Sequence, residues 1–258
     1  MATVTTVPEI VPNDCFLRKL PVGLSLVQRM QFDALRIAAD MIGLANWRLV
    51  NTALHICREE QLRPTGASMS ALLLDAWSII THCHTIRGIL RSLEFNTAEI
   101  SSFLAETRTV SEIRDAQQHY QSQFPNRAQK KTKTAPLYGA IRWTYAKDSL
   151  PLTGLYLVTC WSGATIERKL EVAIPNPAGQ DLRVPIGRLH LQAFDYDIDL
   201  QQITDWVSSL VHHFNTYVAD LVRQGLDKLA EEKKVDKAKL QANAGADLFV
   251  ALWAEIKR

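Results

Sequence analysis

The chain has 258 residues, of which 47% are hydrophobic and 22% are charged, and its formal net charge is +2. This composition is typical of a globular protein that buries a core, and it excludes a disordered or fibrous chain. A net charge this small does not by itself indicate nucleic-acid binding.

Sorting signals, cysteines and common motifs narrow the class of protein further. The N-terminal stretch lacks the basic start and apolar run of a signal peptide, and no segment approaches the about 20 apolar residues of a membrane span. We therefore expect a cytoplasmic protein with no membrane partner. The cysteines form no C-x-x-C pair, and the usual phosphate-loop, dinucleotide and zincin motifs do not occur, so we expect no metal and no cofactor. The cysteines are Cys15, Cys57, Cys83 and Cys160.

Apolar residues spaced by three and four predict two long helices in the first part of the chain. The first runs from Leu24 to about Cys57, and Gly43 and Asn46 are the positions where it would kink or divide. Its pattern is carried by Val27, Met30, Ala34, Ile37, Met41, Leu44, Trp47, Val50 and Leu54. The second helix covers residues 68–93 and should be largely buried.

Residues 97–124 predict a short helix, a turn near residues 107–109 and a further helix. Thr109 is followed by Glu112 at the spacing of a capping box, in which two side chains satisfy backbone N–H groups at a helix start. We therefore expect the further helix to begin at Thr109.

Between Pro136 and about Asp199 the pattern changes to the alternation of β-strands. Four stretches carry it, namely LYGAIRWTYA, GLYLVTCWSG, RKLEVAIPNP and GRLHLQAFDYDI. Consecutive strands with short turns predict an antiparallel meander with one covered face and one wet face.

A long helix is expected from Leu200 to about Leu229, followed by a short amphipathic helix over residues 247–258. Its apolar row either closes the bundle or forms a dimer seam. The row consists of Ile203, Val207, Leu210, Phe214, Tyr217 and Leu221.

Together these elements predict an α+β fold, a helical bundle with an inserted four-stranded antiparallel meander and a returning long C-terminal helix. We expect three parts. Residues 1–124 form the bundle, residues 125–200 the meander, and residues 201–258 the long helix with the short helix that ends the chain.

One short helical segment, residues 112–121, gathers the residues that could carry chemistry. Helical geometry turns Arg114, Asp115 and His119 away from the apolar side of their own helix. Asp115 lies four residues before His119, so its carboxylate can hold one imidazole nitrogen. Arg114 offers a planar cation that can grip a phosphate.

Arg114, Asp115 and His119 match the R-[N/D/H]-x-x-x-H signature of the HEPN superfamily (higher eukaryotes and prokaryotes nucleotide-binding domains). The chain resembles this family in the motif and in its place on a late helix of a bundle, and the resemblance implies that the motif lies at the N-terminal part of that helix. The resemblance covers at most residues 24–124, and the sheet is not a standard part of the family's core. Many members of the family are catalytically silent binding modules.

This resemblance implies a homodimer that acts as a metal-independent endoribonuclease, in which the RNA 2′-hydroxyl attacks the adjacent phosphorus. It implies that His119 transfers a proton, that Arg114 steadies phosphate charge and that Asp115 orients the site. A place in defence or in a toxin–antitoxin system, with an inhibitory protein partner, would fit such an enzyme.

Basic residues near the motif are candidates for holding RNA. Residues 124–200 carry ten basic and seven acidic residues. Arg127, Lys130 and Lys131 lie in a run without acidic neighbours, which is either a solvated linker or an arm that attracts phosphate. Arg87 belongs to a second basic stripe on the second helix and is expected to contact RNA as well.

Two other patterns on the second helix have more than one interpretation. Asp75 and His82 are seven residues apart and share a stripe, so they either support the site or form an ordinary surface or buried hydrogen-bonding group. His82, Cys83 and His84 project in different directions and do not close around one metal ion.

Two hypotheses of different classes follow. The first is a dimeric HEPN-type endoribonuclease that uses Arg114, Asp115 and His119. The second is a non-catalytic module of the same fold that dimerises or binds RNA or a protein partner. A cleft lined by Arg114 and His119 would favour the enzyme, whereas an open convex surface would favour the binding module.

Overall fold

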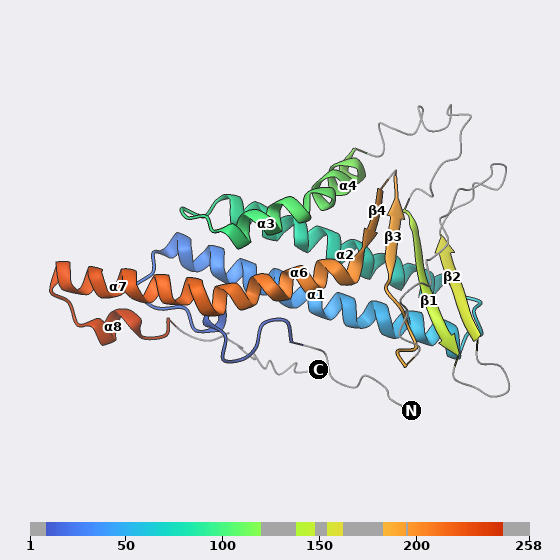
Figure 1. Ribbon diagram of the computed structural model, residues 1–258, viewed down its shortest axis with the longest axis horizontal. Helices are drawn as coiled ribbons and strands as arrows, with labels where there is room; N and C mark the ends of the chain where they lie inside the picture. Colours follow the sequence, from blue (N-terminus) through green and yellow to red (C-terminus); the bar gives the residue numbers. More distant parts are fainter. Residues whose placement is uncertain (1–8, 120–137, 148–153, 162–182, 195, 245–258) are drawn as a thin grey trace, which may run out of the picture.

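The computed structural model describes residues 9–119, 138–147, 154–161, 183–194 and 196–244. Within these ranges the chain is mixed α+β, with long helices side by side and a four-stranded antiparallel sheet at one end (Figure 1). This confirms the α+β class. A single hydrophobic core includes residues of both the helices and the sheet. None of the helices in the described part of the chain has the length and apolar character needed to cross a membrane.

α1 (Leu26–Arg58) is one helix of 33 residues. It begins at a capping box, in which the Ser25 hydroxyl accepts a hydrogen bond from the Gln28 N–H and the Gln28 side chain accepts one from the Ser25 N–H. The helix runs through Gly43 and Asn46 without dividing.

α1 carries two apolar rows, and only one of them faces the core. The buried row consists of Phe32, Leu35, Ala38, Ala39, Ile42, Ala45, Leu49, Ala53 and Ile56. The row from which the helix is predicted lies beside it, and Met30 and Ile37 in that row are 63% and 47% exposed. The spacing of apolar residues therefore identifies the helix but not the side that is buried.

α2 (Gly66–Arg91) packs against α1 and is largely buried, as expected. α3 (Ala98–Glu106) and α4 (Arg108–Gln118) follow, with the buried Thr107 between them. The expected helix start at Thr109 is wrong, because α4 already begins at Arg108. No side chain caps the start of α4. Glu112 instead accepts a hydrogen bond from Arg108 Nε at 3.0 Å, so the expected capping box is not formed.

The sheet is built from two hairpins, which are joined by the pairing of one strand from each. β1 (Ala140–Lys147) pairs over its whole length with β2 (Gly154–Trp161), and β3 (His190–Ala193) pairs with β4 (Tyr196–Asp199). β3 also pairs with β1, so the strand order is β2-β1-β3-β4.

The strand order corrects two details of the expected meander. In a simple meander the expected fourth strand would lie apart from the first, whereas here β3, which is the first half of that fourth strand, lies beside β1. The expected final strand, GRLHLQAFDYDI, divides into β3 and β4 at Phe194, which has a φ of +58°. The expected strand at residues 168–177 lies outside the described residues.

Buried tryptophans attach the sheet to the helices. The Trp143 indole of β1 is fully buried and donates a hydrogen bond to Cys57 Sγ of α1 at 3.4 Å. The Trp77 indole of α2 donates to the Tyr138 carbonyl at 3.0 Å. Gly139 has a φ of +91°, and a Cβ there would lie 2.8 Å from the Gln192 carbonyl oxygen, so only glycine fits where the chain enters β1.

The returning C-terminal helix consists of α6 (Leu200–His213), a π-helical turn η2 (Phe214–Val218) and α7 (Ala219–Lys233), and the short α8 (Lys237–Gln241) follows. In Figure 1, α6 lies in front of α1 and α2, and α7 extends beyond the beginning of α1. The first four positions of the expected apolar row are buried, whereas Tyr217 and Leu221 are exposed. The row therefore closes the bundle along α6. The short helix expected over residues 247–258 lies outside the described residues.

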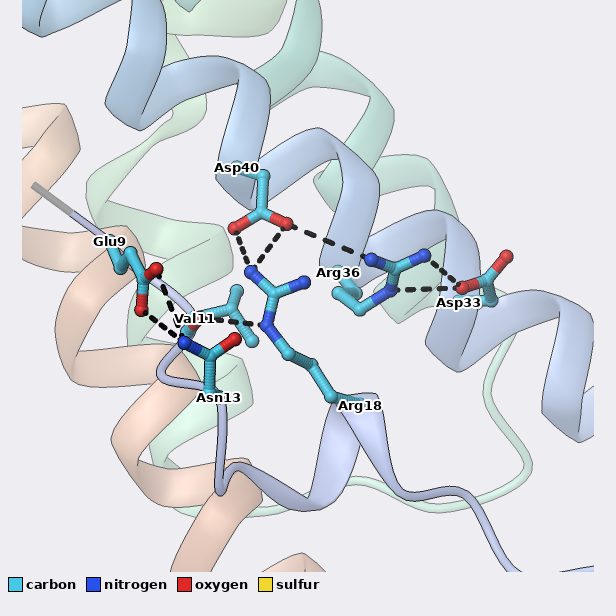
Figure 2. Close-up of polar contacts among 7 residues, drawn as sticks. All are labelled: Glu9, Val11, Asn13, Arg18, Asp33, Arg36 and Asp40. Atoms are coloured by element: carbon cyan, nitrogen blue, oxygen red, sulfur yellow. Dashed lines mark hydrogen bonds and ion pairs between the residues drawn. The ribbon is translucent and has the colours of Figure 1, made fainter. Parts of the chain in front are cut away.

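An ion-pair network attaches the N-terminal segment to α1 (Figure 2). Arg18, at the end of the 3-10 turn η1 (Phe16–Arg18), donates to both Asp40 carboxylate oxygens at 2.9 and 3.0 Å. Arg36 pairs with Asp33 at 2.8 Å and lies 3.9 Å from Asp40. Burial raises the pKa of Asp40, and the nearby Arg18 opposes this rise without cancelling it.

Candidate functional site

α4 places the three motif residues at its C-terminal end, not at the N-terminal part of a helix as the resemblance implies, because α4 already begins at Arg108 and ends at Gln118. Val110 and Ile113 are buried and define the side of α4 that packs on the core. Arg114 is half-buried, whereas Asp115 and His119 are exposed. His119 is the residue that caps the helix, and its N–H donates to the Asp115 carbonyl at 3.2 Å. The expected outward placement of Asp115 and His119 is therefore seen.

The spacing along α4 determines what these groups can do together. Asp115 and His119 are one helical turn apart, so their side chains leave the same side of the helix. Arg114 is the neighbour of Asp115 and leaves α4 about 100° further round. A guanidinium and an imidazole on adjacent parts of one surface can meet a single phosphate, one as a fixed cation and the other as a proton donor or acceptor.

Arg87 fixes the corner from which α4 begins. Its side chain extends from α2, is only 2% exposed, and donates from Nε to the Ser111 hydroxyl at 2.8 Å. The same guanidinium donates to the Leu104 carbonyl and the Thr107 hydroxyl, both at 2.5 Å. Burial, together with the charge of Arg91, lowers the pKa of Arg87. Arg87 thus bonds α2 to the end of α3 and the first turn of α4.

This placement corrects the RNA-contact role expected for Arg87, because a buried guanidinium that donates to three protein groups is not presented to a ligand. The other expected RNA contacts, Arg127, Lys130 and Lys131, lie outside the described residues.

Asp75 and His82 do not form a pair at the motif. Asp75 is 2% exposed and its carboxylate bonds Arg48 of α1 at 3.0 Å. Burial raises the pKa of Asp75, and Arg48 opposes the rise. His82 is half-buried, and burial lowers its pKa. Asp75 is therefore a buried contact between two helices, one of the two interpretations that the sequence left open.

A cavity of about 260 Å³ lies between the start of α4, the β3–β4 hairpin and α6. Sequence reasoning did not find it. Its lining residues are Glu106, Thr109, Val110, His190, Asp197, Ile198, Asp199, Gln202 and Trp206. The motif residues of α4 do not line this cavity. The sequence does hint at this cavity wall. Acidic residues alternate over residues 195–199, and this alternation places Asp197 and Asp199 on one face of β4.

Asp197 is the electrostatic centre of this cavity wall. It pairs with the buried Arg142 of β1, and the nearer of its oxygens lies 3.6 Å from His190 Nδ1. Burial alone would raise the pKa of Asp197, but the interactions with His190 and Arg142 outweigh it and hold the pKa below its usual range. Asp199 pairs with Arg188 at 2.7 Å and caps α6 through the Gln202 N–H. These carboxylates are largely neutralised by their own neighbours.

No group of three or more His, Cys, Asp or Glu residues within the described ranges is arranged to hold a metal ion. Comparisons of the chain with protein-family models, with curated proteins and with solved structures find no match.

Replacing Arg87 by methionine should lower the free energy of unfolding by about 2–4 kcal/mol, because the buried Thr107 hydroxyl, Ser111 hydroxyl and Leu104 carbonyl lose a charged donor. Arg91→Met, at an exposed position one turn along α2, should change it by less than about 0.5 kcal/mol. Urea denaturation followed by circular dichroism measures both. Equal effects of the two substitutions would contradict the anchoring role of Arg87.

Asp197→Asn should lower stability at neutral pH by about 1 kcal/mol, since Asp197 is half-exposed and solvent screens part of its pairing with Arg142. A depressed carboxyl pKa contributes stability that is present above the unfolded value of about 3.9 and is lost as pH falls through the native pKa. The difference between wild type and variant should therefore shrink below about pH 4. Denaturation at several pH values tests this, with the exposed Asp205→Asn as the control. A difference that stays constant with pH would show that the pairing is not the cause.

Proposed function

We propose that this chain is a HEPN-like, metal-independent endoribonuclease of the cytoplasm. The observation that carries the proposal is the placement of Arg114, Asp115 and His119 on the accessible C-terminal half of α4. α4 is itself a short helix held on a long-helix bundle by the buried Arg87. This arrangement supports a rigidly mounted cation and imidazole that a phosphodiester can reach.

The proposed reaction uses the RNA's own 2′-hydroxyl as the nucleophile. As the 2′-oxygen bonds to phosphorus, its proton passes to the imidazole of His119, and the bond to the 5′-oxygen breaks. The leaving 5′-oxygen takes a proton from a second imidazole, supplied by His119 of another copy. The products are a 2′,3′-cyclic phosphate and a 5′-hydroxyl.

Arg114 and Asp115 have supporting roles in this reaction. The guanidinium of Arg114 stabilises the charge that builds up on the phosphate oxygens. Asp115 orients the imidazole one turn further along the helix. One copy supplies only one imidazole, so the site requires a homodimer. A cytoplasmic ribonuclease of this kind also needs restraint in its own cell, which is consistent with an inhibitory protein partner and a role in defence or a toxin–antitoxin system.

The exposure of Asp115 and His119 also supports a second candidate function. In one copy these residues lie at the surface rather than in the cavity beside β4, as would suit a module that binds RNA or a protein without cutting it. The two candidates make different predictions for the fate of bound RNA, so one assay separates them.

The purified protein should cleave single-stranded RNA in EDTA and leave a cyclic phosphate end. His119→Ala should lower the cleavage rate by about 100-fold or more, because it removes the acid and base. Arg114→Ala should lower it by about 100-fold through lost charge stabilisation. Gel analysis of end-labelled RNA gives the rates, and circular dichroism verifies folding.

Arg108→Ala and His212→Ala are the matched controls, since both residues are exposed and lie outside the motif. Their cleavage rates should equal that of wild type. RNA that is bound but never cut would support the binding module. Cleavage that survives His119→Ala would contradict the proposed chemistry.

A further inference from the structure

The side of α1 that faces away from α6 carries an exposed apolar row. Leu26, Val27 and Met30 are 63–65% exposed, and Ile37 and Met41 are 47% and 39% exposed. Large apolar side chains are normally scattered singly over a surface, but these follow one another along about four turns of the same helix. Together they expose on the order of 500 Å² of apolar surface, near the upper end for a single patch on a monomer.

The row has the spacing of a coiled-coil seam. Its members are Val27, Met30, Ala34, Ile37, Met41 and Leu44, which are separated alternately by three and four residues. Alternation of three and four is the repeat of a and d positions that keeps one apolar line facing a partner helix. A helix that merely covers its own core does not need a second such line on its outer side.

The same row is complementary to itself when two copies are antiparallel. In that arrangement each a position faces a d position of the other helix, so Val27 faces the partner's Leu44 and Met30 faces the partner's Met41. Ala34, the smallest member, faces the partner's Ile37, the bulkiest β-branched member. Large residues thus meet small or flexible ones at every level, as close packing requires.

The flank of the row toward α2 presents little that would obstruct a partner. Two contacts show that α2 lies along this side of α1: Gln31 donates to the Ser92 hydroxyl at 3.0 Å, and Arg48 pairs with Asp75. Between Asp75 and Ser92, the α2 residues on the same line are Ser78, His82, Thr85 and Ile89. None of these four is a long charged residue.

Most charges on the opposite flank are paired. Asp33 and Asp40 lie there, and the two arginines of the N-terminal network, Arg18 and Arg36, pair with them (Figure 2). These two carboxylates and two guanidinium groups cancel one another, and Arg29 on the same flank adds one positive charge per copy. A second copy therefore meets mostly paired charges rather than a row of unpaired like charges.

We infer that α1 is the dimerisation helix of this protein, pairing antiparallel with α1 of a second copy through the row from Val27 to Leu44. The occupant is a second copy because the row matches itself, level by level, and because most charges on its flank are paired. A standard interface buries about 800 Å² from each partner. The exposed row supplies more than half of this area, and the adjacent α2 residues supply further contact.

This inference rests on the proposed function in one respect: the proposed ribonuclease requires a homodimer, and the inference names the face through which the two copies pair. α4 lies on the side of α2 away from α1 (Figure 1). A twofold axis that lies in the plane of this face can run across α1 and α2. Such an axis places α1 against α1 of the second copy and α2 against α2 of the second copy. It therefore brings the α4 helices of the two copies to the same edge of the dimer.

Sedimentation equilibrium of the full chain tests the dimer. Wild type should sediment as a dimer at micromolar concentration, and Met30→Glu combined with Ile37→Glu should raise the dissociation constant at least 100-fold, because carboxylates would be buried in the seam. Both positions are exposed in one copy, so the fold should persist, which circular dichroism verifies. Val235→Glu, at an exposed apolar position after α7, is the matched control and should leave the constant unchanged.

Cross-linking tests the antiparallel register. All four native cysteines are buried, so Ala34→Cys adds one accessible thiol near the expected twofold axis. A short bismaleimide should link two copies of this variant within minutes. It should not link wild type, nor Ala105→Cys on the exposed side of α3.

Two outcomes would overturn the inference. A monomeric wild type at high micromolar concentration would show that the row does not pair two copies. A dimer that survives Met30→Glu with Ile37→Glu unchanged would place the interface elsewhere. RNA cleavage is measured separately on the same samples, so a dimer through another face leaves the proposed function standing while this inference fails.

Discussion

The arrangement of the candidate site depends on one buried guanidinium. Arg87 leaves α2 and donates hydrogen bonds to a carbonyl at the end of α3, to Thr107 in the corner and to Ser111 in the first turn of α4. A buried cation is costly unless it is hydrogen-bonded, and these three bonds from Nε and Nη1 hold the corner in one geometry. The motif helix is only 11 residues long and would be marginal alone, and this anchor gives it a defined direction on the bundle.

The two surfaces on which the proposals rest lie on different sides of α2. α4 carries the cation and the imidazole, and the outer side of α1 carries the apolar row. α2 lies between them and touches both, through Arg87 on one side and Asp75 on the other. A dimer built on α1 therefore transmits its geometry to α4 through a single rigid helix rather than through loops.

Periodicity predicted much of the fold, and its errors have a common physical cause. A repeat of three and four shows that α1 is helical, but it cannot tell which of two apolar rows meets the core, because that depends on where α6 and α2 pack. The same limit applies to GRLHLQAFDYDI, whose alternation reveals a strand but not the reversal at Phe194. Pairing of β3 with β1 instead of β2 is a long-range choice that no local pattern encodes.

In the candidate site, too, local sequence predicts which way a helical side chain points but not which distant residues it contacts. The outward placement of Asp115 and His119 follows from the helical wheel alone. The expected surface role of Arg87 failed because its partners come from a corner 17 to 24 residues further along the chain. The cavity wall around Asp197 was not found, since Arg142 and His190 reach it only through sheet pairing.

The most direct test of the central claim is a crystal structure of the protein with a short RNA whose attacking 2′-hydroxyl is replaced by hydrogen, so that it binds without being cut. The account predicts a dimer in which the phosphate beside the modified sugar lies within hydrogen-bonding distance of Arg114 and His119, with both copies contributing to one cleft. A phosphate bound away from α4, or a bound monomer, would contradict it.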